Sequence, residues 1–128
     1  MITIVDDDKL VRDALEDLIT SFGHRVRTYE SAVQFLASGE VAETSCLITD
    51  VQMPGMSGLD LQQHLLASGS NIPVIFLTAF PQEHAKALAL DRGALAFLHK
   101  PFNEPDLISC VDRALDLADQ QRVTQQQL

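Results

Sequence analysis

The segment CLITDVQMPG, at residues 46–55, decides the fold class of this chain. Its first four residues are mostly apolar, the fifth is Asp50, and Pro54 and Gly55 then interrupt any regular structure. A short apolar run that ends in an acid and a Pro-Gly loop is typical of a buried parallel strand. Such a strand presents its last side chain at the carboxyl edge of the sheet, where ligands of open α/β sheets bind. Asp50 is therefore the first candidate functional residue.

Three further apolar runs also lead to polar residues. Asp6, Asp7 and Asp8 follow the run Ile2–Val5, Thr78 ends the run Val74–Thr78, and Lys100 comes soon after the run Leu95–Leu98. Because the carboxyl ends of parallel strands share one edge, we expect these side chains to form one site with Asp50.

The chain alternates strand and helix patterns five times. The expected strands are Ile2–Val5, Arg25–Tyr29, Cys46–Thr49, Val74–Thr78 and Leu95–Leu98. Alternating strand–helix units predict a parallel sheet with right-handed crossovers. The predicted fold is α/β, a doubly wound, flavodoxin-like (βα)5 domain with a five-stranded parallel sheet of order 2-1-3-4-5. The alternation of arginines with apolar residues in Arg25–Tyr29 indicates an edge strand.

Helical patterns with recognisable ends lie between the strands. The first places Leu10, Ala14, Leu15, Leu18 and Phe22 on one face, which we expect to be buried. The others are expected to begin near Ser31, Ser57, Pro81 and Asn103. Beyond Ala118 the apolar pattern ends, so residues 1–118 are expected to form one domain and residues 119–128 a helix end and polar linker.

Composition excludes several function classes. The 128 residues carry a formal charge of -9, which argues against nucleic-acid binding by this segment. No apolar run approaches the ~18 residues of a membrane span, and Met1 leads into a strand rather than a basic, apolar leader. Cys46 and Cys110 lie inside apolar segments without CxxC spacing and are expected to be reduced. The expected location is the cytoplasm.

The expected site contains the parts for phosphoryl transfer to a carboxylate. Two carboxylates ~4 Å apart repel by roughly 4 kcal/mol at an effective dielectric constant of 20, so Asp6, Asp7 and Asp50 require a cation between them. Oxygen ligands of this kind suit Mg²⁺. Lys100 supplies further positive charge, Thr78 can hydrogen-bond a phosphoryl oxygen, and Asp50 can attack to form an acyl phosphate.

The motifs together resemble the response-regulator receiver domain of two-component signal transduction. They are VDDD at residues 5–8, TDVQMPGMSG at 49–58, TA at 78–79 and KPF at 100–102. The resemblance implies that Asp50 is the phosphoacceptor and that Thr78 and Lys100 bind the phosphoryl group. It also implies that Asp7, Asp50 and the main-chain carbonyl of Gln52 ligate Mg²⁺, with Asp6 acting through water.

The same resemblance implies how a signal leaves the site. Phosphoryl binding is expected to draw Thr78 towards Asp50, and Phe97, at the aromatic switch position, is expected to turn inward. Lacking a hydroxyl, Phe97 must act through packing. The Lys100–Pro101 bond is expected to be cis.

The resemblance also implies the partners. They are a sensor histidine kinase as phosphodonor and a second copy of the domain, bound through the helix Pro81–Arg92, the strand Leu95–Leu98 and the last helix. A C-terminal DNA-binding output domain outside these 128 residues is a further expected partner, because the motifs look like those of receivers in transcription activators.

Two other functions compete with a phosphorylatable switch. Phosphatases of the haloacid dehalogenase type also use a strand-end Asp, Mg²⁺, a Thr or Ser and a Lys. They need a second acid two positions after the nucleophile, where this chain has Gln52. A receiver that has lost phosphorylation and acts only as an interaction surface is less favoured, because every key site position is present. The domain is thus not expected to be a turnover enzyme and would catalyse only its own phosphorylation and dephosphorylation.

Overall fold

The computed structural model describes residues 1–79 and 82–126 and contains one five-stranded parallel sheet. The strand order is β2-β1-β3-β4-β5, which confirms the predicted doubly wound topology and the edge position of the second strand. The strands are β1 (Ile2–Val5), β2 (Val26–Tyr29), β3 (Cys46–Thr49), β4 (Val74–Thr78) and β5 (Ala96–His99). Three of them have the predicted bounds, whereas β2 and β5 each begin one residue later than predicted.

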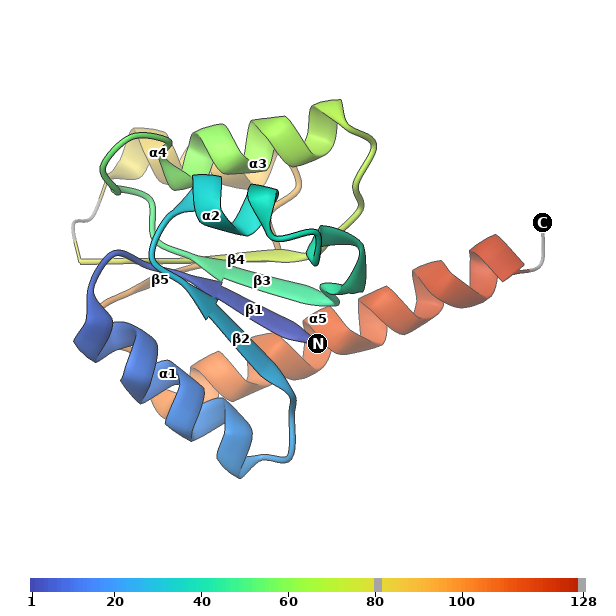
Figure 1. The fold of residues 1–128 in the computed structure, drawn as a ribbon, viewed down its shortest axis with the longest axis horizontal. Helices are drawn as coiled ribbons and strands as arrows, with labels where there is room; N and C mark the ends of the chain where they lie inside the picture. Colours follow the sequence, from blue (N-terminus) through green and yellow to red (C-terminus); the bar gives the residue numbers. More distant parts are fainter. Residues whose placement is uncertain (80–81, 127–128) are drawn as a thin grey trace.

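Helices cover both faces of the sheet (Figure 1). They are α1 (Lys9–Ser21), α2 (Ala32–Ala37), α3 (Gly58–Ala67), α4 (Glu83–Asp91) and α5 (Glu104–Gln126), with a 3-10 turn at Val41–Glu43. Figure 1 shows α2, α3 and α4 on one face and α1 and α5 on the other. None of the helices within residues 1–79 and 82–126 is long and apolar enough to cross a membrane.

The core has two layers because successive strand side chains point to opposite faces. On β3, Leu47 belongs to the layer beneath α2 and α3, and Ile48 belongs to the layer beneath α1 and α5. Both side chains are almost fully buried, as are all residues of β1, β3 and β4. Apolar side chains therefore fill most of the sheet interior, and the polar residues at the strand ends gather at its carboxyl edge.

Side-chain caps fix where the helices begin at that edge. Asp8 accepts a hydrogen bond from the Leu10 N–H at 2.9 Å and so caps α1. Ser57 and Asp60 form a capping box at the start of α3. Asn103 accepts from the Asp106 N–H at 3.0 Å, as expected for the start of α5. Because each cap satisfies N–H groups that have no partner inside the helix, each holds its loop against the carboxyl edge.

The predicted apolar face of α1 is correct at Leu15 and Leu18, which contact the core, and wrong at its two ends. Leu10 is 79% exposed and Phe22 is 56% exposed, while Leu15 and Ile19 are buried and Val11 packs beside them. The buried stripe thus follows the i, i+4 spacing from Val11. Sequence periodicity could not decide between the two faces because apolar residues occur on both.

The last helix continues into residues 119–126, within the segment predicted to be a helix end and polar linker. Backbone hydrogen bonding continues to Gln126, and residues 127–128 lie outside the described residues. Gln and Arg are good helix formers, so a helix can continue after its apolar face has ended. The predicted start of α4 at Pro81 also lies outside the described residues, and the helix itself begins at Glu83.

Candidate functional site

The four polar strand ends meet at the carboxyl edge of the sheet. Val5 of β1 pairs with Thr49 of β3, so that Asp6 and Asp50, the next residues, emerge side by side. Thr78 ends β4 and pairs with His99 of β5, which directly precedes Lys100. The parallel register therefore brings together residues separated by up to 94 positions in the sequence.

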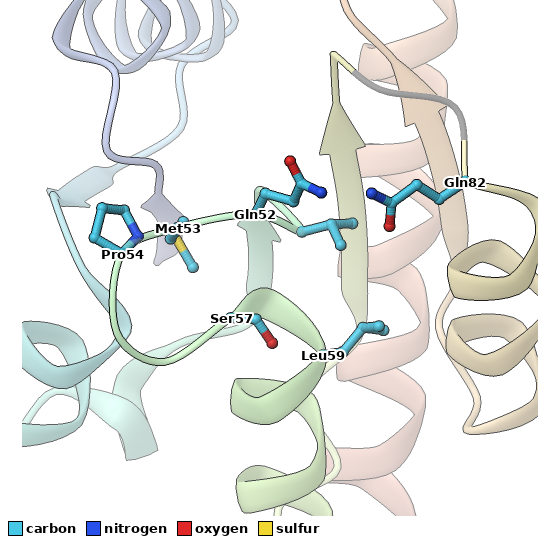
Figure 2. Close-up of a pocket in the computed structure, with 7 residues that line it drawn as sticks. Gln52, Met53, Pro54, Ser57, Leu59 and Gln82 are labelled. Atoms are coloured by element: carbon cyan, nitrogen blue, oxygen red, sulfur yellow. The ribbon is translucent and has the colours of Figure 1, made fainter.

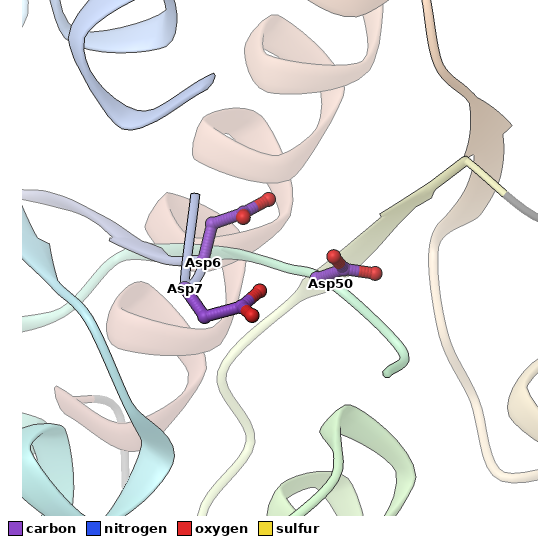
Figure 3. A group of neighbouring side chains, drawn as sticks. All are labelled: Asp6, Asp7 and Asp50. Carbon is purple, nitrogen blue, oxygen red and sulfur yellow. The ribbon is translucent and has the colours of Figure 1, made fainter. Parts of the chain in front are cut away.

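Asp6, Asp7 and Asp50 form an acidic cluster (Figure 3). One carboxylate oxygen from each lies within 4.8 Å of those of the other two. Asp6 is 2% exposed and Asp50 is 8% exposed, whereas Asp7 is exposed. Three convergent carboxylates with one open side offer hard oxygen ligands, which fit a divalent cation such as Mg²⁺.

Lys100 connects two of these acids. Its ammonium donates to Asp6 Oδ2 at 2.8 Å and to Asp50 Oδ2 at 3.0 Å. The lysine side chain is 15% exposed, so both ion pairs are largely shielded from water. The ammonium balances one of the three negative charges, which leaves the cluster acidic.

Burial and these ion pairs shift the pKa values in the site. Burial raises the pKa of Asp6, and the hydrogen bond from Lys100 offsets only part of that shift. Burial alone would lower the pKa of Lys100, but its hydrogen bonds to Asp6 and Asp50 raise it overall. Lys100 therefore remains charged at neutral pH. Keeping Asp6 ionised in this cluster costs free energy, and a bound cation can reduce that cost.

Main-chain groups and one arginine fix the acids. The Asp8 N–H donates to Asp6 Oδ1 at 2.9 Å, and the Gln52 N–H lies 3.3 Å from Asp50 Oδ1. Arg12 of α1 donates to the Asp6 carbonyl oxygen at 2.7 Å. Sequence reasoning missed Arg12, because its place beside the acids depends on how α1 packs on the sheet.

Gly58 allows α3 to begin directly against the phosphoacceptor candidate. A Cβ atom at this position would overlap the Asp50 carbonyl oxygen. The Gly58 N–H also donates to the Val51 carbonyl at 2.8 Å. Only a residue without a side chain permits this approach, so glycine is required at this position.

Thr78 and Phe97 lie on adjacent strands behind the site. Thr78 is 1% exposed, and Phe97 is 8% exposed with its ring centroid 5.9 Å from that of Phe76. Phe97 packs in the apolar layer that also contains Ala85 and Ala89 of α4. The Lys100–Pro101 bond is cis, as predicted.

An open pocket of about 490 Å³ adjoins the acidic cluster (Figure 2). It is lined by Val51, Gln52, Met53, Pro54, Ser57, Leu59 and Gln82. Figure 2 shows the side chains of Gln52 and Gln82 on opposite sides of it, one after β3 and one before α4. Sequence reasoning missed Gln82, since no motif contains it.

The chain matches a known protein family along most of its length. The response regulator receiver domain family matches residues 2–112. The response regulator protein TmoT of Ectopseudomonas mendocina is 43% identical over 95% of this chain and 56% of its own length. The transcriptional regulatory protein TdiR of Thauera aromatica is 40% identical over 98% of this chain and 57% of its own length.

A solved structure agrees with these matches. The structure of the response regulator StyR superposes with a TM-score of 0.92 at 36% identity, covering 98% of this chain and 64% of that one. The chain therefore belongs to the response regulator receiver domain family. It spans little more than half the length of the curated relatives named above, which are response and transcriptional regulators.

Proposed function

We propose that this domain accepts a phosphoryl group on Asp50 from the phosphohistidine of a sensor histidine kinase. The observation that carries the proposal is the contact of Asp50 with both Lys100 and the Asp6–Asp7 pair. A carboxylate held beside an ammonium and two further acids is suited to phosphoryl chemistry, because the surrounding charges can act on the phosphoryl oxygens. The family of the chain supports the same function.

In the proposed reaction, a carboxylate oxygen of Asp50 attacks phosphorus in line with the leaving imidazole. A P–O bond forms as the P–N bond breaks, and the imidazole nitrogen leaves with the electron pair. The Lys100 ammonium, which now bridges Asp6 and Asp50, would move onto a phosphoryl oxygen. Thr78 would donate its hydroxyl proton to another. The domain thus catalyses only its own phosphorylation and dephosphorylation.

Asp6, Asp7, Asp50 and the main-chain carbonyl of Gln52 are proposed to hold Mg²⁺. The clustering of three carboxylate oxygens within 4.8 Å supports this assignment. When bound, Mg²⁺ neutralises negative charge on the phosphoryl oxygens. As the family resemblance implies, Asp7 and Asp50 are proposed as direct ligands, with Asp6 acting through water.

Thr78 and Phe97 are proposed to pass the signal to the face formed by α4, β5 and α5. Movement of Thr78 towards the phosphoryl group changes the space beside Phe97, whose ring packs on Phe76. Because packed side chains rearrange between discrete states, a small shift can select one arrangement of this face. The face is proposed to bind a second copy of the domain or an output domain.

We also propose the place of this domain in a longer regulator. Residues 1–118 would form the receiver, and residues 119–128 the helix end and polar linker to a C-terminal DNA-binding output domain. The names of the relatives, which include a transcriptional regulatory protein, support an output in transcription. The net charge of -9 assigns DNA contact to that further domain rather than to this one.

Acetyl phosphate with Mg²⁺ tests the chemistry. We expect intact-protein mass spectrometry to show one added phosphoryl group that hydroxylamine removes, as it does for acyl phosphates. The Asp50→Asn variant should gain none, and Asp17→Asn, which changes an exposed acid on α1, should react like the parent. Undiminished labelling of Asp50→Asn would exclude Asp50 as the phosphoacceptor.

A further inference from the structure

Helix α4 is only lightly packed on the sheet. Its buried side chains are Ala85 and Ala89, two methyl groups, whereas α5 buries Leu107, Cys110, Val111 and Ala114. Apolar stabilisation scales with the area removed from water, so α4 gains little from burial. Polar contacts therefore have an unusually large share in fixing its position.

Both polar contacts to α3 lie at the C-terminal end of α4. The Gln62 side chain of α3 is 3% exposed, and its Nε2 donates to the Ala89 carbonyl oxygen at 3.0 Å. Arg92, the residue that caps α4, donates to the Leu59 carbonyl at 3.4 Å. At the other end, Gln82 makes no side-chain capping bond to the first turn of α4. The helix is thus held at one end.

Gln62 is an unusual choice for this position. Its neighbours Leu61 and Leu65 are buried and apolar. The Ala89 carbonyl already accepts a hydrogen bond from the Ala94 N–H at 3.0 Å. Among the described residues, moreover, the buried Gln62 Oε1 has no hydrogen-bond partner. A leucine here would leave no polar atom unsatisfied, so a buried amide with one unpaired oxygen requires an explanation.

A residue with spare donors lines the same pocket as that oxygen. Gln62 and Arg92 both line a pocket of about 200 Å³ between α3, α4 and the late part of α5. The guanidinium has five N–H donors, and its bond to the Leu59 carbonyl is long. A small displacement of the α4 end would let Arg92 exchange the Leu59 carbonyl for Gln62 Oε1.

We propose that Gln62 is a positioning residue that pins the Ala89 end of α4 to α3, so that α4 moves as a lever about this end and its Glu83 end moves most. Arg92 is its second partner. In the arrangement described here Arg92 contacts Leu59, and in the displaced arrangement it contacts Gln62 Oε1. The contacts determine the direction of movement. The Glu83 end of α4, nearer to the phosphoacceptor, is displaced, whereas the Ala89 end stays in place and only rotates. The movement of α4 as a lever rests on the proposed phosphorylation of Asp50. The Gln62 contact that pins α4 to α3 does not depend on it.

Hydrogen exchange of the protein without phosphoryl group tests the pin. In Gln62→Leu, we expect the amides of Arg92, Gly93 and Ala94 to exchange roughly tenfold faster than in the parent, because the end of α4 opens more often. Gln63→Leu is the matched control, since Gln63 is the exposed neighbour on the same helix. Equal exchange in the two leucine variants would overturn the proposal, whatever the outcome of the phosphorylation experiment.

NMR with beryllofluoride and Mg²⁺ tests the lever. In the parent and in Gln63→Leu, the amides of Glu83 and His84 should shift more than those of Ala89 and Arg92. In Gln62→Leu the shifts should spread along the whole helix. Arg92→Met keeps the Gln62 pin and should reduce the shift at the Glu83 end.

The loop amides of Val51 and Gln52 report separately whether the ligand binds. If those amides shift but Gln62→Leu gives the parent pattern along α4, the lever is wrong and the proposed function stands. If they do not shift, the proposed function fails and the exchange experiment still decides the pin. Should Gln62→Leu not fold, Gln62→Met, which keeps the length of the side chain without its polar atoms, replaces it.

Discussion

The interior of strand β3 and its carboxyl end differ sharply within a few residues. Cys46 to Thr49 are all buried between two apolar layers, and the next residue, Asp50, enters a cluster of acids. Burial raises the pKa of the Cys46 thiol to about 12, so the interior keeps this group neutral. At the strand end, carboxylates are held close together beside Lys100. The buried interior therefore stabilises the fold. Repulsion among the carboxylates at the strand end lowers the free energy of unfolding, and the same carboxylates form the binding site.

Ile48→Ala should have the largest effect on stability. Ile48 is 1% exposed, and removing a buried isoleucine side chain costs about 2–5 kcal/mol, because the lost transfer free energy is increased by a cavity. Urea denaturation measures the free energy of unfolding. Val33→Ala is the control, since Val33 is 58% exposed and its truncation should cost less than about 0.5 kcal/mol. Equal losses would contradict the assignment of stability to the interior.

Asp7→Asn should have a smaller effect of opposite sign. Without Mg²⁺, removing one charge from the cluster should raise the free energy of unfolding by about 1 kcal/mol, since Asp7 is exposed and its repulsion is screened. The parent should gain about 2.7 kcal/mol when Mg²⁺ is present at a hundred times its Kd, and the variant should gain much less.

Thermal melts with and without Mg²⁺ measure both quantities. A parent whose melting temperature does not respond to Mg²⁺ would argue against the proposed metal site. An Asp7→Asn protein less stable than the parent without metal would argue against repulsion within the cluster.

The pH dependence of Asp6 should be the smallest effect, because Lys100 offsets part of the burial cost. Burial raises the pKa of Asp6 in the folded protein above its ordinary value of 3.8. Between that value and the raised pKa, the folded state binds more protons than the unfolded state, so stability is lost as the pH rises through this window.

Urea denaturation of the parent and of Asp6→Asn at several pH values isolates this effect. The free energy of unfolding of the parent, relative to the variant, should fall as the pH rises from 3.8 through the raised pKa of Asp6. A relative stability that rises over this range would show that Asp6 is stabilised as a carboxylate in the fold.

Much of the fold was predictable because the strands have simple local signals. The runs Ile2–Val5, Cys46–Thr49 and Val74–Thr78 are short, apolar and bounded by turn residues, and the structure gives all three the predicted bounds. The alternation of strands and helices then leaves few topologies. The grouping of Asp6, Asp50 and Lys100 followed from topology alone, because parallel strands share one carboxyl edge.

Other features of the fold depend on tertiary packing and backbone hydrogen bonding, which local sequence patterns do not specify. The buried face of α1 was predicted only in part, because Leu10 and Phe22 are as apolar as Val11 and Ile19, and only packing on the sheet distinguishes them. The length of α5 depends on backbone hydrogen bonds that polar side chains permit as well as apolar ones.

The sequence by itself therefore determined the fold class, the strand order and the set of strand-end residues that meet, since these follow from periodicity and chain topology. Tertiary structure alone decided which of them touch and how strongly. The Lys100 bridge to Asp6 and Asp50, the Arg12 contact and the Gln62 bond to Ala89 all join elements whose separation is set by packing. A hydrogen bond weakens within an ångström or so of its best distance, and that precision is finer than any pattern of residue types can specify.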